Sequence, residues 1–448
     1  MREPLRPVGD DAVEELARVQ PPMFSRAGSG AACRVCFRSV QPERVKTPLG
    51  EVWRSVGIAT AITLPGLLVR VGIIHPSVAV EAALFGASIM GAAFMLAWAA
   101  EVAQLDISQT LAIAVLAIVA VLPEYAVDLV LSYRAGQGTS DPGLAIANMT
   151  GANRLLIGIG WAAVVLVYWA KTRNKEVTLR KEQRTDVGYL LLASLWAATI
   201  PLRHSINYLD LAVLGLLFVG YIMRAAKEDV VEPELVGTPA AIATMATVPR
   251  RVTTIAMFLF AATAILVVAE PFAESLKDIG SEFGISQFLL IQWVAPLASE
   301  APEMIIAILF VLRLKAQAGL GTLISSKVNQ WTLLVATLPL VFSLGAGHLD
   351  GLPIDDRQRE ELFLTAAQSL FAVGVIANLS ISRLEAVVLL VLFSAQLAIP
   401  ITAVRVGFAV AYVVLFLGMI ALRPGVRQGL WTAVRHVFRR TEESLPSR

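Results

Sequence analysis

Leu122-Pro123-Glu124 and Ala301-Pro302-Glu303 are two copies of one interruption, a proline followed at once by a glutamate inside a long apolar segment. A carboxylate at membrane depth costs several kcal/mol on insertion scales, and a proline in a helix leaves a backbone carbonyl without its donor. Two such costly positions in corresponding halves of one chain are typical of a transporter's binding site. The pair therefore predicts a cation site within a membrane.

A longer internal repeat surrounds the two Pro-Glu pairs. Ile107-Ser108-Gln109 precedes the first pair and Ile285-Ser286-Gln287 precedes the second, with spacings that differ by one residue. Downstream, each copy continues into a second hydrophobic helix, which we expect to be interrupted at residues 148–153 in one copy and 325–329 in the other. Internal repeats with broken hydrophobic segments indicate a secondary transporter.

The composition is that of a membrane protein. The chain has 448 residues, of which 56% are hydrophobic and 16% charged, with a mean hydropathy of +0.68. Its charges collect at the two ends and in a few loops, so the net charge of +2 gives no reason to expect a nucleic-acid partner. No phosphate-binding P-loop is present, which argues against an ATP-driven pump, and no enzyme is predicted. The two cysteines, Cys33 and Cys36, are only half of a zinc site and are expected to be free thiols.

Twelve hydrophobic stretches are long enough to cross a bilayer, on the rule of about 20 apolar residues per helix. They lie near residues 52–75, 77–104, 108–133, 142–170, 187–203, 207–225, 251–275, 283–313, 318–347, 360–378, 383–400 and 404–422. The predicted fold is an all-α polytopic membrane protein with about 12 transmembrane helices. It contains two inverted five-helix repeats, residues 77–225 and 251–400, and one extra helix at each end.

Three segments lie outside the two halves of the membrane domain, residues 51–225 and 251–422. They are an N-terminal arm, a linker and a basic tail, at residues 1–50, 226–250 and 423–448. All three are rich in basic residues, and an even number of spans separates them, so we expect them to be cytoplasmic in an inner (plasma) membrane. The two Pro-Glu helices then run in opposite directions, as an inverted repeat requires.

The residues of the candidate site favour a hard cation. Each proline frees one backbone carbonyl, that of Val119 in the first helix and that of Ala298 in the second. Such carbonyls beside the carboxylates of Glu124 and Glu303 form an oxygen-rich environment, which suits Ca2+ or Na+ and not soft metals.

Further ionisable residues accompany the two glutamates. Asp128 follows the first glutamate by four residues and Glu300 precedes the second by three, so each shares a helix face with its neighbour. The second helix of each repeat adds a base, Arg154 or Lys327. These bases either stand in for bound monovalent ions or form structural ion pairs with Asp128 and Glu300, and the acids themselves can carry protons.

The repeat layout resembles the Ca2+:cation antiporter superfamily, which includes Na+/Ca2+ exchangers. The resemblance covers residues 77 to 400 and rests on a Pro-Glu helix followed by an asparagine-bearing helix in each repeat. It implies that Glu124 and Glu303 are the paired acidic ligands of the transported metal ion. It also implies that Asn153 and Asn329 are the asparagine ligands.

The chain departs from the family pattern beside both asparagines. Ala152 and Val328 stand where the family has serine, and Leu156 and Thr332 stand where it often has a further Asn or Asp ligand. Several ligands of the Na+ type are therefore missing, and the coupling ion stays open. The further candidate site residues are Asp128, Glu300, Arg154, Lys327, Thr332, Asn148, Ser325 and Ser326.

These observations predict a secondary active antiporter that exchanges Ca2+ or a similar hard cation for Na+ or H+ by alternating access. It needs no cofactor beyond the transported cations, and its partners are small inorganic cations and the lipid bilayer. Two alternatives are a monovalent cation/proton antiporter and a membrane scaffold or channel without exchange activity. A homo-oligomer is left open.

Overall fold

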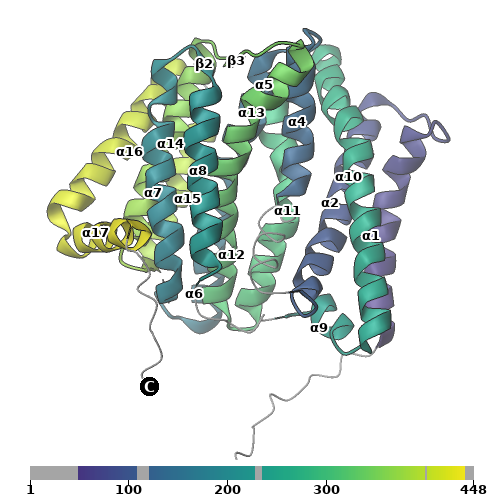
Figure 1. Ribbon diagram of the computed structural model, residues 1–448, viewed down its shortest axis with the longest axis horizontal. Coiled ribbons are helices and arrows are strands. Elements are labelled where there is room, and N and C mark those ends of the chain that lie inside the picture. Colours follow the sequence, from purple (N-terminus) through teal and green to yellow (C-terminus); the bar gives the residue numbers. More distant parts are fainter. Residues whose placement is uncertain (1–48, 108–120, 228–234, 399–400, 439–448) are drawn as a thin grey trace, which may run out of the picture. The chain divides into compact units, whose positions relative to one another are not determined.

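The computed structural model describes residues 49–107, 121–227, 235–398 and 401–438, and these form helices joined by short turns (Figure 1). The helices are α1 (Leu49–Arg70), α2 (Val78–Ala103), α4 (Leu122–Gly136), α5 (Pro142–Leu155), η3 (Leu156–Trp161), α6 (Ala162–Thr172), η4 (Lys181–Gln183), α7 (Arg184–Ala197), η5 (Ile200–Leu202), α8 (Tyr208–Ala225), α9 (Thr238–Ile242), α10 (Thr247–Phe283), α11 (Gln287–Leu312), α12 (Ala316–Asn329), η6 (Gln330–Leu334), α13 (Val335–Ala346), α14 (Asp356–Ile376), α15 (Arg383–Ala398), α16 (Thr402–Leu422) and α17 (Pro424–Phe438).

Four short strands form two antiparallel pairs that join loops at the helix ends. β1 (Glu176–Thr178) pairs with β4 (Ser380–Ser382), and β2 (Ser205–Ile206) pairs with β3 (Leu352–Pro353). Each pair connects a loop of the first repeat to a loop of the second. Figure 1 shows β2 and β3 at the opposite end of the helices from α9.

Nine helical stretches of the described residues are long and apolar enough to cross a membrane. They correspond to nine of the twelve predicted spans, and the remaining three predictions fall on α4, α14 and α15. These three helices are short or carry more polar residues within the described part of the chain. The all-helical polytopic class is confirmed. The predicted arm up to residue 48, with Cys33 and Cys36, and residues 108–120 lie outside the described residues.

Several predicted boundaries differ from the structure, and two of them concern α10. This helix continues to Phe283, whereas the prediction ended it at residue 275. The helix stops at Gly284, whose φ of 65° is a left-handed conformation that glycine adopts without strain. The predicted linker 226–250 also contains α9 and the first residues of α10.

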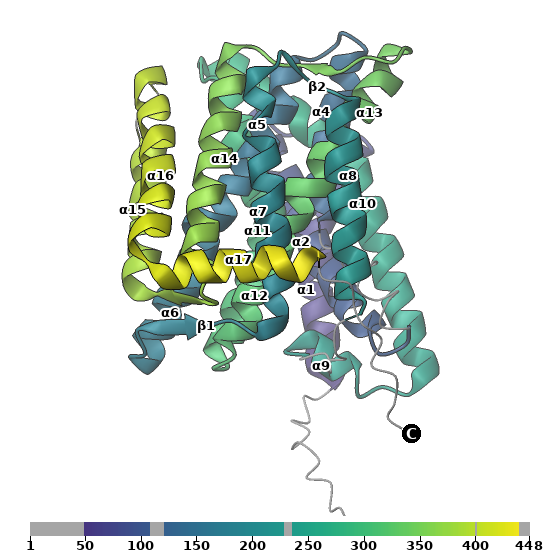
Figure 2. The same cartoon turned by 60° about the vertical axis from the view of Figure 1, so that its left-hand side comes forward.

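The predicted basic tail begins with a helix, α17, that lies crosswise to the membrane helices (Figure 2). One face of α17 is buried through Val426, Gly429, Leu430 and Ala433, and the helix packs on α7, α14 and α16. At Gly188 of α7, a side chain would collide with this helix. Burial of the apolar face explains why a basic segment is ordered here.

The two repeats interlock at the centre of the membrane domain. α4 packs against α13, which continues the helical stretch that begins with α12, and α11 packs against α5, which carries Asn153 (Figure 1). Glycines permit the close approach of α4 and α13. A Cβ at Gly136 would lie 2.0 Å from the carbonyl oxygen of Phe342, and one at Gly345 would lie 2.1 Å from that of Tyr133.

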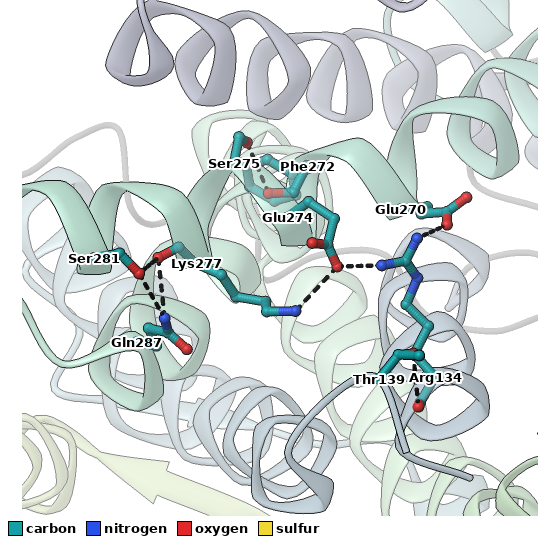
Figure 3. A network of polar contacts seen from close by, with 9 residues as sticks. All are labelled: Arg134, Thr139, Glu270, Phe272, Glu274, Ser275, Lys277, Ser281 and Gln287. Carbon is teal, nitrogen blue, oxygen red and sulfur yellow. Dashed lines mark hydrogen bonds and ion pairs between the residues drawn. The ribbon is translucent and has the colours of Figure 1, made fainter. Parts of the chain in front are cut away.

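Ion pairs tie α10 to its neighbours at two levels. In its second half, Glu270 and Glu274 pair with Arg134 of α4, and Glu274 also accepts a hydrogen bond from Lys277 (Figure 3). These side chains are partly exposed, so the network contributes little to stability and mainly sets the position of α10 beside α4.

At the start of α10, Arg250 and Arg251 pair with Asp106, in the loop after α2. The hydrogen bonds from Arg250 lower the pKa of Asp106 to about 2. Because the folded pKa is the lower one, this pair stabilises the fold fully above the unfolded pKa of aspartate and is lost only as the pH falls towards 2. The stability contributed by this pair therefore does not change with pH near neutrality.

The contact between α4 and α13 predicts a stability difference between two glycine variants. Gly136→Ala forces the helices apart and should lower the free energy of unfolding by about 1–3 kcal/mol. Gly215→Ala on α8 is the control, because a Cβ there meets no atom within 4 Å. Thermal unfolding of the two purified variants in one detergent is the measurement. Equal midpoints would show that the repeats do not depend on this approach.

Candidate functional site

The candidate cation site lies where α4 and α11 meet α5 and α12. Glu124 is in the first turn of α4, beside Pro123, whose missing N–H costs nothing at a helix start. Glu303 follows Pro302 inside α11, which continues unbroken. Pro302 leaves the carbonyl of Ala298 without its helical donor, whereas Val119, named with Pro123, lies outside the described residues.

The asparagine helices are not interrupted where the sequence suggested. Residues 148–153 and 325–329 are regular α-helix, which corrects that expectation. The irregularity follows directly, because α5 passes into the π-helical η3 and α12 into the π-helical η6. π-Helical turns within α-helices are frequent at functional sites, and here they occur just after the asparagine in both repeats.

Four buried carboxylates gather in this region. Only 1% of Glu124 is exposed, and its charge interacts with those of Glu300, Asp128 and Glu303. Glu300 in turn interacts with Asp128. The acids of the two Pro-Glu helices thus form a single cluster, which we call the carboxylate cluster: Glu124, Asp128, Glu300 and Glu303. Like charges held together without water are costly unless a cation or protons compensate them.

Amide side chains donate hydrogen bonds to only some of the oxygens of the carboxylate cluster. The side chain of Asn148 donates to Asp128 Oδ1 (3.0 Å), and that of Gln330 donates to Glu300 Oε1 (2.7 Å). Other buried oxygens at the site have no hydrogen-bond partner among the described residues. They are Glu124 Oε1 and Oε2, Asp128 Oδ2, Asn148 Oδ1, Glu300 Oε2, Glu303 Oε2, Ser326 Oγ, Asn329 Oδ1 and Gln330 Oε1.

These oxygens are the ligand type that Ca2+ takes. In the described part of the chain, no three acidic, histidine or cysteine side chains converge closely enough to hold a metal ion by themselves. A cation at this position would therefore need amide, hydroxyl or carbonyl oxygens beside one or two carboxylates, as hard cations accept. Ser326 interacts with Glu303, and Asn329 directly precedes Gln330, which donates to Glu300, so their oxygens are the candidates for this requirement.

Lys327 lies within the same region and is fully buried. Its ammonium group donates a hydrogen bond to Asn153 Oδ1 and lies 4.4 Å from the centre of the Trp331 ring. The carboxylates of Glu124 and Glu300 attract an ammonium group at this position, but neither forms a direct ion pair with it among the described residues. Of the two alternatives for Lys327, the ion pair with Glu300 is not found among the described residues, because the ammonium group donates to Asn153 instead.

Arg154 belongs to a different group of residues. Its guanidinium pairs with Glu361 of α14 at 2.6 Å and lies 5.0 Å from the centre of the Trp293 ring. Of the two alternatives for Arg154, a structural ion pair is found, but its partner is Glu361 of α14 and not Asp128. Arg405 of α16 lies beside the same carboxylate, at 3.6 Å.

The hydroxyl candidates differ in their surroundings. Ser326 is buried and faces Glu303. Ser325 donates to Asp186 of α7 (3.0 Å), and the hydroxyl of Thr332 donates to the carbonyl oxygen of Val328 in its own helix (2.6 Å). Ser326 is therefore the hydroxyl that lies with the cluster.

Sequence reasoning missed two polar residues, Gln330 and Glu361. Gln330 directly follows Asn329, the position that Arg154 holds after Asn153, so aligning the repeats on their asparagines was the signal for it. Glu361 lies at the start of a predicted span, where a carboxylate appears interfacial. Only the packing of α14 on α5 shows that it is buried beside Arg154.

Comparison with known proteins places this geometry in context. A family model described as "Sodium/calcium exchanger protein" matches residues 77–226 and 253–402, which lie within two residues of the two predicted repeats. A comparison with curated protein sequences found no match.

Several solved structures share the fold. The crystal structure of an H+/Ca2+ exchanger, CAX, is 40% identical, covers 87% of this chain and 99% of that chain, and has a TM-score of 0.83. The Ca2+/H+ antiporter protein YfkE is 16% identical, covers 81% of this chain and 99% of that one, and has a TM-score of 0.55. The sodium-calcium exchanger NCX_Mj, in one of its structures, is 20% identical over 72% of this chain and 99% of that one, with a TM-score of 0.51. The last two likenesses concern the fold alone.

The Arg154–Glu361 pair predicts a stability effect without an ion-specific one. Arg154→Gln leaves a buried carboxylate without its main partner and should cost about 3–5 kcal/mol of unfolding free energy. The half-exposed Arg423–Glu385 pair provides the control, since Arg423→Gln should cost less than about 1 kcal/mol.

A second variant separates charge from packing at this pair. Arg154→Met combined with Glu361→Leu removes both charges and should regain most of the stability, measured by thermal unfolding. A stable Arg154→Gln protein with altered ion dependence would instead show that Arg154 acts at the cation site.

Proposed function

Because this chain belongs to the sodium/calcium exchanger family and is a membrane Ca2+/cation exchanger, not an enzyme, we propose that it exchanges Ca2+ for protons through the carboxylate cluster. In this proposal Glu124 and Glu303 are the principal ligands of the transported Ca2+, and Asn329 and Ser326 supply neutral oxygens. Protons bind the same carboxylates when Ca2+ leaves.

The group of buried oxygens without donors is the observation that carries this proposal. Unpaired acceptors cost about 1–3 kcal/mol each when they are buried, and a bound cation satisfies several of them at once. An anion or an apolar substrate would leave them unpaired. The site chemistry therefore selects a cation, and its carboxylate and amide oxygens select a hard one.

Protons are favoured over Na+ as the counter-ion by what surrounds the two asparagines. Ala152, Val328 and Leu156 have no side-chain oxygen at positions where other members of the family carry ligands of the Na+ type. The carboxylate cluster and Lys327 together carry a formal charge of minus three when all are ionised. One Ca2+ neutralises two of these charges, and protons on the same acids can replace it without any further ligand.

The interlocked repeats suggest how access alternates. α4 of the first repeat packs against α13 of the second, and α11 of the second against α5 of the first, so the cluster lies between the two repeats. We propose that small shifts of one half against the other open the cluster to one side and then the other, as in other inverted-repeat transporters. Neutralisation of the cluster by Ca2+ or by protons permits this step, because an unbalanced buried charge is costly.

The similarity to a 40% identical H+/Ca2+ exchanger supports this proposal over its two alternatives. A monovalent cation carries a single charge and would balance fewer of the four buried carboxylates than Ca2+ does. A scaffold or channel without exchange activity has no need to keep these acids buried, since their burial only destabilises the fold.

Exchange is tested with the two principal glutamates. Glu124→Gln and Glu303→Gln keep the volume of the side chain but remove the charge that a hard cation requires, so each should abolish Ca2+ flux while the protein still folds. The measurement is Ca2+ uptake into proteoliposomes driven by an imposed pH gradient. Glu282→Gln, an exposed position at the end of α10, is the matched control.

The same vesicles test the counter-ion. Wild-type flux should follow the pH gradient and should not change when Na+ replaces choline. Between pH 6 and 8 the Asp106 pair stays ionised, so it adds no pH dependence of its own. Near wild-type flux in either glutamine variant would remove that glutamate from the site, and flux driven by Na+ alone would reject protons as the counter-ion.

We further propose that the arm, the linker and the tail face the cytoplasm of a plasma membrane. Tags placed near residue 5, between residues 228 and 234, and near residue 445 should resist an external protease. A tag after Leu349, whose side chain is 84% exposed, should be cleaved. Detergent-permeabilised vesicles, in which every tag is cut, provide the control. Equal protection of the tags at Leu349 and at residues 228–234 would contradict the inverted arrangement.

A further inference from the structure

We propose that Lys327 acts as a built-in monovalent cation. Its ammonium group occupies the position beside Asn153, in the first repeat, where a Na+ ion would bind, and thereby excludes Na+ as a coupling ion. This inference rests on the proposed Ca2+/H+ exchange. It assigns a specificity-determining role to a residue that the family resemblance does not supply.

The surroundings of the ammonium group are those of a bound cation. Lys327 is fully buried, donates to the amide oxygen of Asn153, and lies over the face of Trp331. The carboxylates of Glu124 and Glu300 attract it. An amide oxygen and an aromatic face are groups that bind a monovalent cation in proteins. Here both contact a cationic group that is attached to the chain.

The two repeats are unequal at this position. When the repeats are aligned on Asn153 and Asn329, Lys327 corresponds to Gly151. A Cβ at Gly151 would lie 1.8 Å from the carbonyl oxygen of Gln292, so α11 leaves no room for a side chain there. A lysine is therefore accommodated in only one of the two repeats, and the site is asymmetric.

The asparagines are unequal as a result. Asn153 Oδ1 accepts the hydrogen bond from Lys327, whereas Asn329 Oδ1 is buried and has no donor among the described residues. One amide oxygen is thus available to a transported ion and the other is already used. A Na+ ion at Asn153 would have to displace the ammonium group of Lys327. Because this group is attached to the chain, its local concentration does not depend on the ions in solution.

A purely structural role for Lys327 is the competing explanation. Buried bases that hold a fold together usually pair directly with a carboxylate, as Arg154 does with Glu361 at 2.6 Å. Lys327 instead gives its hydrogen bond to a neutral amide and keeps its charge beside the carboxylate cluster. This contrast indicates that Arg154 belongs to a structural ion pair, whereas Lys327 acts as a resident cation.

The test replaces Lys327 with a neutral residue that carries an oxygen. Lys327→Thr should make Ca2+ flux sensitive to Na+, because the cluster gains one unbalanced negative charge. We expect a half-effective Na+ concentration at least about tenfold below the highest concentration at which wild-type flux is unaffected. The measurement is Ca2+ flux in proteoliposomes at fixed pH gradient with increasing Na+. Lys181→Thr, an exposed position, is the matched control.

The double variant Lys327→Thr with Asn153→Leu should lose the acquired Na+ sensitivity, because the subsite then lacks its amide oxygen. A folded Lys327→Thr protein that ignores Na+, or Na+ sensitivity that survives the loss of Asn153, would overturn the proposal. Wild-type flux separates the two hypotheses. Failure of the wild type to exchange Ca2+ for protons rejects the proposed function, whereas an unaltered Lys327→Thr rejects only the resident cation.

If Lys327→Thr does not fold, Asn153→Leu alone supplies the test. Loss of the tether releases the ammonium group towards Glu124 and Glu300, so the apparent affinity for Ca2+ should fall severalfold while Na+ still has no effect. An unchanged Ca2+ affinity in the folded variant would overturn the proposal.

Discussion

The burial of four carboxylates against one another is the constraint on which the rest of this structure depends. Glu124, Asp128, Glu300 and Glu303 are nearly inaccessible, and several of their oxygens lack donors within the described residues. Such a cluster lowers stability unless cations or protons compensate it. The surrounding helices must hold the acids close enough to share an ion, and the glycine contacts between α4 and α13 are one means by which they do so.

Inverted repeats usually imply two equal halves, but the polar residues of this protein are unequal. Asp128 lies after its glutamate and Glu300 before its own, while Lys327 has a glycine as its counterpart. The backbone features are shared, since each asparagine is followed by a π-helical turn. We propose that the shared backbone features serve alternating access and that the unequal side chains determine which ions are exchanged.

Basic side chains in this molecule serve three different purposes. Arg134 ties α10 to α4, and the two arginines that pair with Asp106 tie α10 to the loop after α2. Arg154 pairs with the buried Glu361 and joins α5 to α14. Lys327 donates its hydrogen bond to a neutral amide near the carboxylate cluster. Separating these purposes requires the partner of each base, because the bases look alike in a hydrophobic sequence.

The sequence by itself determined the membrane class, the two repeats and the two Pro-Glu positions, because hydropathy and costly buried carboxylates leave a pattern along the chain. It also pointed to Asn153 and Asn329 through the repeat. Only the tertiary structure decided that Arg154 pairs with Glu361 and that Lys327 binds Asn153, since these partners lie 207 and 174 residues apart. The continuity of α10 past residue 275 and the ordering of α17 were likewise decided by packing. Side-chain pairing depends on which helix faces which, and that geometry is not encoded in any local pattern.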